Sequence, residues 1–481
     1  MNFAIVRYLI GWLMGIESLF LLLPAFTAVI YREPELPASL ATALICMVGA
    51  GILCEYKPKN TKFYAREGFV AVALCWLVLA VTGALPFVLS REIPFAVDAI
   101  FEAASGFTTT GATILGDVEA LSHASMLWRC LMHWVGGMGI LVFMLIVLPL
   151  AGGQTIYLMR AESPGPSVSK ISPPMRDTAL ILYALYFGLT VLQITLLLLG
   201  GMPMFDAICV SLGTAGTGGF GNWNDSIAHY DSAYLQNVIS VFMILFGINF
   251  NAYFLLLTRK FKQLFKIEEI RVYLGVIAVF TTLIAFNVRG CFSSLRESFH
   301  HSLFQVASII TTTGFSTVDF NQWPAFSKLL IVLLMFIGAC AGSTAGGMKI
   351  CRIAMLWKQG VRSVRHTFQP RKVQVVRFEG KGVDDTLLRE TASFACVYVA
   401  MVLIGAVLIA FEGKYDIETN LSAALTCVSN VGPGFNAVGP AGNFAGYGSF
   451  AKVVLSLLML AGRLELYPML ALLYPALWRK Q

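Results

Sequence analysis

Four short runs rich in threonine and glycine contain the residue types of this sequence that could bind a metal ion through the backbone. Glycine adopts backbone angles that other residues avoid, so it lets successive carbonyl oxygens gather on one side of an extended run. Threonine hydroxyls add further oxygens. Rings of carbonyl oxygens replace the hydration shell of a monovalent cation such as K⁺ in selective pores. The runs are Thr109-Thr110-Gly111, Thr217-Gly218-Gly219, Thr312-Thr313-Gly314 and Val431-Gly432-Pro433-Gly434.

Each run ends a semi-apolar segment that is too short to cross a membrane, because a spanning helix needs about 20 residues. The four segments align without a gap, and each ends on glycine followed by alanine or phenylalanine. We therefore predict four re-entrant half-helices at 98–112, 206–220, 301–315 and 421–435. This alignment makes Gly111, Gly219, Gly314 and Gly434 equivalent, and it places Gly218 and Pro433 at the positions of Thr110 and Thr313.

The repetition is what favours a pore over simpler explanations. Helix packing or an ordinary loop would explain one such segment. Extended backbone at membrane depth, however, survives only inside protein or beside a water-filled path. Half-helices whose C-terminal ends point at a common axis would also favour a cation there. Four copies at matching places therefore predict a cation pore.

The composition is typical of a membrane protein. Of the 481 residues, 57% are apolar and 13% are charged, whereas soluble domains carry about 25% charged residues. We predict an all-α polytopic membrane protein with ten transmembrane helices. The expected spans are 8–30, 37–54, 68–90, 127–150, 177–200, 234–257, 270–288, 326–350, 388–411 and 450–478.

The order of these segments predicts internal repeats. A unit of spanning helix, half-helix, glycine run and spanning helix occurs four times, which predicts four-fold pseudosymmetry. The expected divisions are an extra helix pair at 1–56 and pore repeats at 57–160, 161–260, 261–372 and 373–481.

The positions of lysine and arginine predict the orientation in the lipid bilayer. Most of the 34 lysines and arginines lie in the connections 55–67, 151–176, 258–271 and 349–390. Short cytoplasmic connections carry the excess of basic residues. We therefore predict that both termini are cytoplasmic.

Other classes of function have less support in the sequence. A membrane-embedded enzyme needs a paired acid and base or a metal-binding group of residues, and the six histidines show no such spacing. We predict no enzyme activity, no tightly bound cofactor and no nucleic-acid partner. A docking scaffold would leave the four glycine-ending segments unexplained. A coupled secondary transporter stays an alternative, although such proteins usually carry ionisable residues at the membrane midplane.

A further glycine cluster lies inside the predicted span 326–350. Glycine costs up to about 1 kcal/mol per interior helix position, so this cluster predicts a break with a loop at 339–348. Close helix packing through Gly338, Gly342 and Gly346 is the alternative. The residues at this break are Gly342, Ser343, Thr344, Gly346 and Gly347.

Arg463 lies within the last apolar span. A charged side chain there is costly and usually faces a cavity or a partner. Glu465 is two residues away and does not share its helix face, so a pair between them is weak. Glu102 lies within the first half-helix, and we expect it to support the filter through hydrogen bonds, with direct contact to the ion as the alternative.

At these residues the chain resembles the Trk/Ktr/HKT superfamily of K⁺ transporters, and within it the bacterial TrkH/TrkG type. The resemblance covers nearly the whole chain. The residues that carry it are 109–113, 218–220, 312–315, 430–434, 160–162 with 164–166, 341–344 and 462–465.

The resemblance implies K⁺ uptake across the bacterial cytoplasmic (inner) membrane through a channel-like filter, with K⁺ as the transported ion. Family members form homodimers and work with a cytosolic ring of RCK-type nucleotide-binding regulatory subunits, the TrkA type. It also implies that the loop at 339–348 obstructs the path below the filter, near Arg463. The candidate gate residues are therefore Gly342, Ser343, Thr344, Gly346, Gly347 and Arg463. Glycine at all four filter positions implies K⁺ selectivity. A K⁺/H⁺ or K⁺/Na⁺ symporter is the alternative.

Overall fold

The structure is a computed structural model that describes residues 3–475 apart from 57, 59–64, 140–174, 265 and 373. The described part is mostly helical, with one small antiparallel hairpin of β1 (Arg377–Phe378) and β2 (Lys381–Gly382). The prediction of an all-α architecture is confirmed.

The helices follow the predicted order of an extra pair and four units. The extra pair is α1 (Phe3–Tyr31) and α2 (Leu36–Cys54). The first unit contains α3 (Ala65–Thr82), α4 (Leu85–Ser90), α5 (Ala96–Phe107) and α6 (His123–Gly137). The second contains α9 (Met175–Leu199), α10 (Met204–Gly216), α11 (Ala233–Phe246) and α12 (Phe250–Leu257), and the short helix α13 (Phe261–Leu264) follows it.

The third and fourth units have the same plan. The third contains α14 (Glu268–Asn287), α15 (Leu295–Ile310), α16 (Ala325–Ile337) and α17 (Ile350–Phe368). The fourth contains α18 (Asp385–Ala410), α19 (Ile417–Ser429), α20 (Ser449–Arg463) and α21 (Tyr467–Leu472). The predicted half-helices correspond to α5, α10, α15 and α19, one in each unit.

Local sequence explains where several of these helices begin. Ser122, Ser232, Ser294 and Asp416 precede α6, α11, α15 and α19, and each side chain accepts a hydrogen bond from a backbone amide in the first turn. Such N-caps satisfy an amide that has no partner within the helix. These four helices, two of them half-helices, therefore start at fixed residues.

The predicted number of continuous spans is not reproduced. Six helices of the described part are long and apolar enough to cross a membrane, and α11 with α12 form a further candidate that is bent by 92°. The expected spans 234–257, 326–350 and 450–478 are each interrupted, and most of the second half of 127–150 lies outside the described residues. In the last of the three, Glu465 and Leu466 adopt positive φ just after the end of α20.

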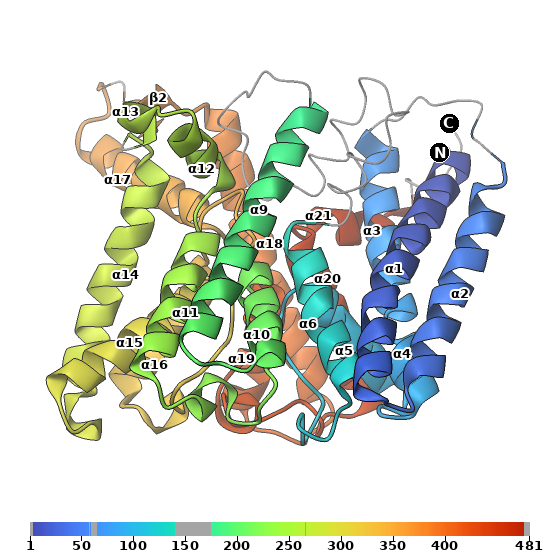
Figure 1. The fold of residues 1–481 in the computed structure, drawn as a ribbon. Coiled ribbons are helices and arrows are strands. Elements are labelled where there is room, and N and C mark those ends of the chain that lie inside the picture. The colour runs from blue at the N-terminus through green and yellow to red at the C-terminus, as the bar shows by residue number, and fades with distance from the viewer. Residues whose placement is uncertain are drawn as a thin grey trace.

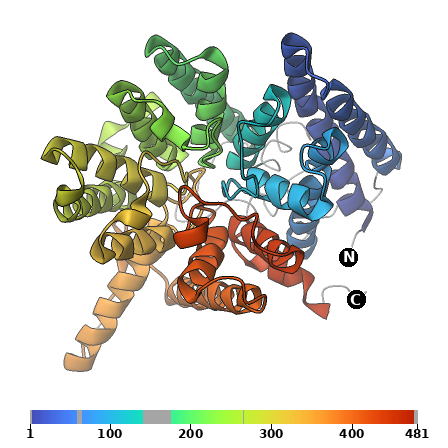
Figure 2. The ribbon, with the colours of Figure 1, turned by 90° about the horizontal axis from the view of Figure 1, so that it is seen from below.

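The units surround a common centre. In Figure 1 the helices stand side by side, with the start of α1, α13, α17 and β2 at the top. Seen from below in Figure 2, the four units follow one another around the middle of the molecule, and the blue pair α1 and α2 lies outside them. The extended runs that follow the half-helices are thereby brought together.

Candidate ion-conduction site

The four half-helices end with the same backbone conformation. A non-glycine residue with φ of 55–57° follows each helix, and a glycine with φ of 78–95° follows two positions later. The amide of the residue between them donates to the carbonyl five positions earlier. These bonds join Thr110 to Ser105 (2.9 Å), Gly218 to Gly213 (2.9 Å), Thr313 to Ser308 (2.8 Å) and Val431 to Thr426 (2.9 Å).

We call these runs the filter strands and define them as 109–111, 217–219, 312–314 and 430–432. They correct the predicted alignment of the fourth run. Gly432 has φ of 95° and corresponds to Gly111, whereas Gly434 does not adopt positive φ. The prediction that Gly434 is equivalent to Gly111 is therefore wrong, and Val431 rather than Pro433 corresponds to Thr110. The shift arises because α19 ends at Ser429, so Asn430 takes the left-handed conformation that Thr109 has in the first strand, two residues earlier than the alignment predicts.

The filter strands contact one another in a closed cycle. A Cβ atom added to each filter glycine would collide with the carbonyl oxygen of the middle residue in the next strand. Side chains are therefore excluded at these positions, and the backbones approach directly. The collisions pair Gly111 with Gly218, Gly219 with Thr313, Gly314 with Val431 and Gly432 with Thr110. Four strands that close a cycle in this way surround one axis.

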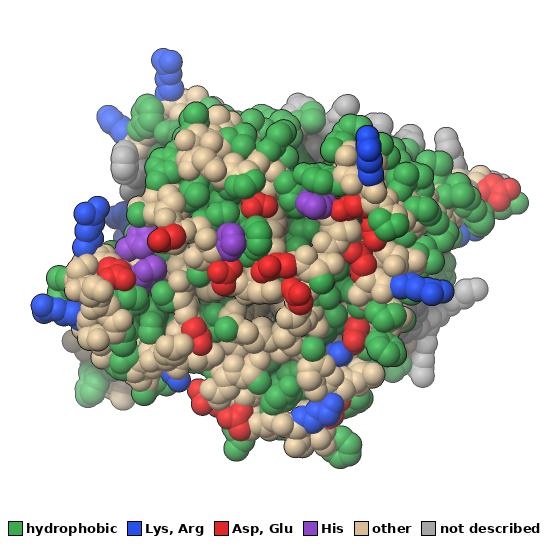
Figure 3. Space-filling model, turned by 60° about the horizontal axis from the view of Figure 1, so that its bottom comes forward, with side chains coloured by type: hydrophobic (Ala, Val, Ile, Leu, Met, Phe, Trp, Pro, Cys, Tyr) green, Lys and Arg blue, Asp and Glu red, His purple; other side chains and the backbone are tan. Residues whose placement is uncertain are grey.

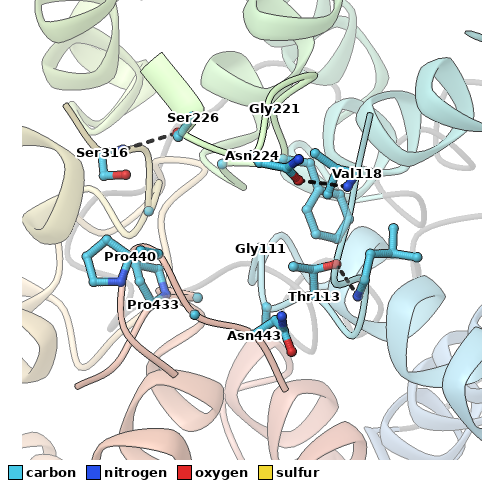
Figure 4. Close-up of a pocket in the computed structure, with 18 of the residues that line it drawn as sticks. Gly111, Thr113, Val118, Gly221, Asn224, Ser226, Ser316, Pro433, Pro440 and Asn443 are labelled. Atoms are coloured by element: carbon cyan, nitrogen blue, oxygen red, sulfur yellow. Dashed lines mark hydrogen bonds between the residues drawn. The ribbon is translucent and has the colours of Figure 1, made fainter. Parts of the chain in front are cut away.

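A hollow with a volume of about 130 Å³ lies on one side of the filter strands and is lined by residues from all four units. Figure 4 shows Gly111 and Pro433 among its lining residues, and Asn224 reaches across to the Val118 amide at 2.9 Å. Acidic side chains gather around the centre of this face, and lysine and arginine lie mostly toward its edge (Figure 3). Such a field concentrates cations at the mouth.

Asp117 is one carboxylate beside this hollow, between the lining residues Gly116 and Val118. Hydrogen bonds from the Asn224 side chain and the Glu119 amide lower the pKa of Asp117. A lowered pKa keeps the carboxylate ionised at neutral pH. The negative charge of this loop is therefore present under the conditions in which a cation would enter.

On the other side of the filter strands, α16 ends at Ile337 and α17 begins at Ile350. The predicted break is confirmed. Gly338 has φ of 69° and starts the loop. The loop reaches the filter, because the Gly346 amide donates to the Thr312 hydroxyl at 2.7 Å. It therefore lies directly against the filter strand of the third unit.

Arg463 joins this loop to two other parts of the centre. Its guanidinium donates to the Thr344 carbonyl at 2.7 Å and to the Gly136 and Gly137 carbonyls at 2.5 and 2.6 Å. It also lies 3.3 Å from the Thr109 hydroxyl of the first filter strand. The predicted gate residues Thr344 and Arg463 are thus in contact.

Glu465 pairs with Arg352 instead of Arg463. The Arg352 guanidinium lies 2.5 Å from the Glu465 carboxylate. Arg352 is in the first turn of α17, and Glu465 lies in the break after α20. This ion pair ties the helix that follows the loop to the chain segment that carries Arg463.

Behind the first filter strand lies a buried ion pair of Glu102 and Arg129, of which the sequence predicts only Glu102. Glu102 accepts hydrogen bonds from the Thr113 hydroxyl and the Ile114 amide, both at 3.0 Å, as its expected supporting role requires. Arg129 of α6 lies 2.8 Å from Glu102 and 4.0 Å over the Phe220 ring. An arginine among the apolar residues of α6 was the available signal for this site.

Replacing Arg129 with methionine is expected to destabilise the protein by ~3–5 kcal/mol, because it leaves a buried carboxylate without its partner. Glu102 and Arg129 have side-chain exposures of 0% and 1%. The measurement is the thermal unfolding temperature of the detergent-purified chain. Adding Glu102→Gln to Arg129→Met removes the unpaired charge and should recover part of the loss. An unfolding temperature equal to that of the unmodified chain would count against this role.

Comparison with known proteins assigns the family. A profile of the TrkH family, described as a cation transport protein, matches residues 38–479. The Trk system potassium uptake protein TrkH of Salmonella typhimurium is 35% identical over 100% of both chains. The Trk system potassium uptake protein TrkG of Escherichia coli K12 is 33% identical over 99% of this chain and 98% of its own length. The crystal structure of the potassium transporter TrkH from Vibrio parahaemolyticus matches with a TM-score of 0.89 and 30% identity, over 100% of both chains. The chain therefore belongs to the TrkH family of cation transport proteins.

Proposed function

We propose that this chain takes up K⁺ across the bacterial cytoplasmic membrane by channel-like conduction along the axis of its filter strands. The observation that carries the proposal is the closed cycle of contacts between the four strands. The similar proteins are named potassium uptake proteins, which supports K⁺ as the transported ion. The chain acts as a transporter and not as an enzyme.

The filter would work by exchanging water for backbone oxygen. Carbonyls of the filter strands would replace the hydration shell of the ion, as carbonyl rings do in K⁺-selective pores. The C-terminal ends of α5, α10, α15 and α19 lie next to these strands and would add negative potential. An inside-negative membrane potential drives the cation inward with about 2.3 kcal/mol per charge per 100 mV. With both termini in the cytoplasm, the hollow would face outward.

The loop at 339–348 would close this path below the filter. Gly346 contacts Thr312 of the filter, and Arg463 holds the Thr344 carbonyl close to Thr109. The guanidinium would lower cation occupancy there by repulsion. We further propose that the protein works as a homodimer with a cytosolic RCK-type nucleotide-binding ring, and that this ring moves the loop through α17.

The ion pair between Arg352 and Glu465 gives a test of this route. Replacing Arg352 with glutamine should reduce the nucleotide-dependent change in Rb⁺ flux several-fold, because α17 would no longer be tied to the segment that carries Arg463. The measurement is Rb⁺ flux into liposomes with the regulatory ring, with and without nucleotide. Arg362, also on α17, forms a more exposed ion pair with Asp385 of α18. Arg362→Gln breaks that pair and should leave the nucleotide response intact. An equal response in both variants would contradict the route.

Reconstitution of the purified chain in liposomes tests the proposed function itself. We expect Rb⁺ to enter down its gradient at a rate that follows the membrane potential. We also expect the Rb⁺ flux to be much larger than the Na⁺ flux. Flux against the K⁺ gradient, driven by a pH or Na⁺ step with the voltage clamped, would contradict channel-like conduction and favour a symporter. Equal Rb⁺ and Na⁺ flux would contradict a K⁺-selective filter.

A further inference from the structure

The filter strand of the second unit lacks the hydroxyl contacts found behind the other three. In each of the other units, a hydroxyl at the end of the half-helix or on the strand lies within hydrogen-bond distance of a second hydroxyl. These contacts are Thr108–Thr110 at 2.7 Å, Thr311–Thr313 at 2.8 Å and Ser429–Tyr398 at 2.6 Å. The second unit has Gly216 and Gly218 at the corresponding positions. Neither residue can make such a contact.

The His133 residue of α6 occupies the space that side chains would take at these two glycines. A Cβ atom at Gly218 would overlap the His133 ring, and one at Gly216 would collide with the His133 carbonyl. The ring is fully buried. Its Nδ1 lies 2.7 Å from the Gly106 carbonyl, which can only accept, so Nδ1 carries the hydrogen. The ring is therefore fixed to the first half-helix while it packs against the second filter strand.

A second contact fixes the far end of the same strand. Phe220 follows the filter glycine Gly219, and its ring stacks on the His133 ring with 4.2 Å between centroids. The Arg129 guanidinium lies over the same phenylalanine ring at 4.0 Å. Arg129 and His133 are four residues apart on α6, so they share one helix face. This face holds both Gly218 and Phe220.

We propose that His133 is a positioning residue for the second filter strand, and that its ring contributes to the preference for K⁺ over Na⁺ by holding this strand in place. The inference rests on the proposed function of the filter strands. Three of the four residues 216–219 are glycine, and glycine has the greatest backbone freedom of all residues. Without the ring, this strand would be the least constrained of the four, and its carbonyls would adapt to a smaller ion.

Substitutions at positions 133 and 218, made singly and together, test the inference. His133→Ala should lower the Rb⁺ over Na⁺ flux ratio in liposomes by about tenfold, which corresponds to ~1.4 kcal/mol. Gly218→Thr should also lower it, because the new side chain meets the ring. The double variant should recover most of the ratio, since the introduced threonine then enters the space left by the ring, as threonine does in the first and third strands. His133→Asn keeps a donor for the Gly106 carbonyl. Its flux ratio should lie between that of the unmodified chain and that of His133→Ala.

Two controls separate the possible failures. His123→Ala changes a half-exposed histidine at the start of the same helix and should keep the ratio. Gly219→Ser changes the filter itself. If Gly219→Ser lowers the ratio but His133→Ala and Gly218→Thr do not, the role of His133 is overturned and the filter stands. If Gly219→Ser also leaves the ratio unchanged, the proposed function fails and the inference fails with it. Should His133→Ala not fold, as judged by size exclusion, Gly218→Thr and its rescue by the double variant decide the question.

Discussion

Replacing Gly432 with serine is expected to lower the preference for K⁺ over Na⁺ by tenfold or more, about 1.4 kcal/mol or greater. Gly432 has φ of 95°, where any other residue is strained. Its new Cβ atom would lie 2.5 Å from the Thr110 carbonyl oxygen. That oxygen must move away, which breaks the cycle between the fourth and first strands. Paired Rb⁺ and Na⁺ flux measurements in liposomes report the change.

Gly434→Ser is the matched control for this prediction. A Cβ atom at Gly434 would meet Ser422 and Val438, and neither residue belongs to a filter strand. This variant should retain most of the selectivity, with some loss of stability from crowding. Gly111→Ser, at the position equivalent to Gly432 in the first strand, should behave like Gly432→Ser. If Gly434→Ser relaxed selectivity and Gly432→Ser did not, the corrected alignment of the fourth strand would be wrong.

Arg463→Gln is expected to raise Rb⁺ flux at least about tenfold in the absence of the regulatory ring, equivalent to ~1.4 kcal/mol. The guanidinium spans the Thr344 carbonyl of the loop and the Gly136 and Gly137 carbonyls at the end of α6. Glutamine is shorter, is uncharged and cannot reach all three. The loop would lose a tether, and the path would lose a positive charge.

Arg463→Lys separates these two effects. Lysine keeps the charge but lacks the planar fork that contacts several carbonyls at once. An intermediate flux would assign part of the closure to charge and part to the tether. Basal flux and nucleotide response that stayed at their original level in both variants would remove Arg463 from the gate.

The repeats, the half-helices and the break at Gly338 could be predicted because each has a local sequence cause. Apolar length separates spanning helices from half-helices, and dense glycine disfavours a helix interior. The four half-helices lie where they are predicted, but each begins two to six residues early and ends four to six residues early, because the glycine run at the end of each predicted segment is extended and not helical. Interruptions in other spans were less visible, because Glu465 and Leu466 take positive φ without a glycine to signal it.

The alignment of the fourth filter strand could not be settled by pattern matching. The segment Val431-Gly432-Pro433-Gly434 offers two glycines, and Gly434-Phe435 copies the ending of the second and third runs. The positive φ of Gly432 and its contact with the first strand identify it as the filter glycine. Asn430 was the local clue, since asparagine is among the few residues that tolerate the left-handed conformation.

The side chains behind the filter were equally hard to predict. His133 packs against a strand that lies far along the chain, in the next unit, and no local motif connects the two. The glycine at 218 is explained only when the His133 ring is seen in the place of a side chain. Long-range packing of this kind is not encoded in local residue patterns.

The most direct test of the central claim is to locate the ion in a crystal soaked with Tl⁺ or Rb⁺, by anomalous scattering. We predict a peak on the axis of the filter strands, within coordination distance of the carbonyl oxygens of Thr110, Gly218, Thr313 and Val431. Weakening of the peak by added K⁺, with little effect of added Na⁺, would support selectivity at that position. An axis without such a peak, in protein that still transports Rb⁺, would contradict the claim that these carbonyls bind the transported cation.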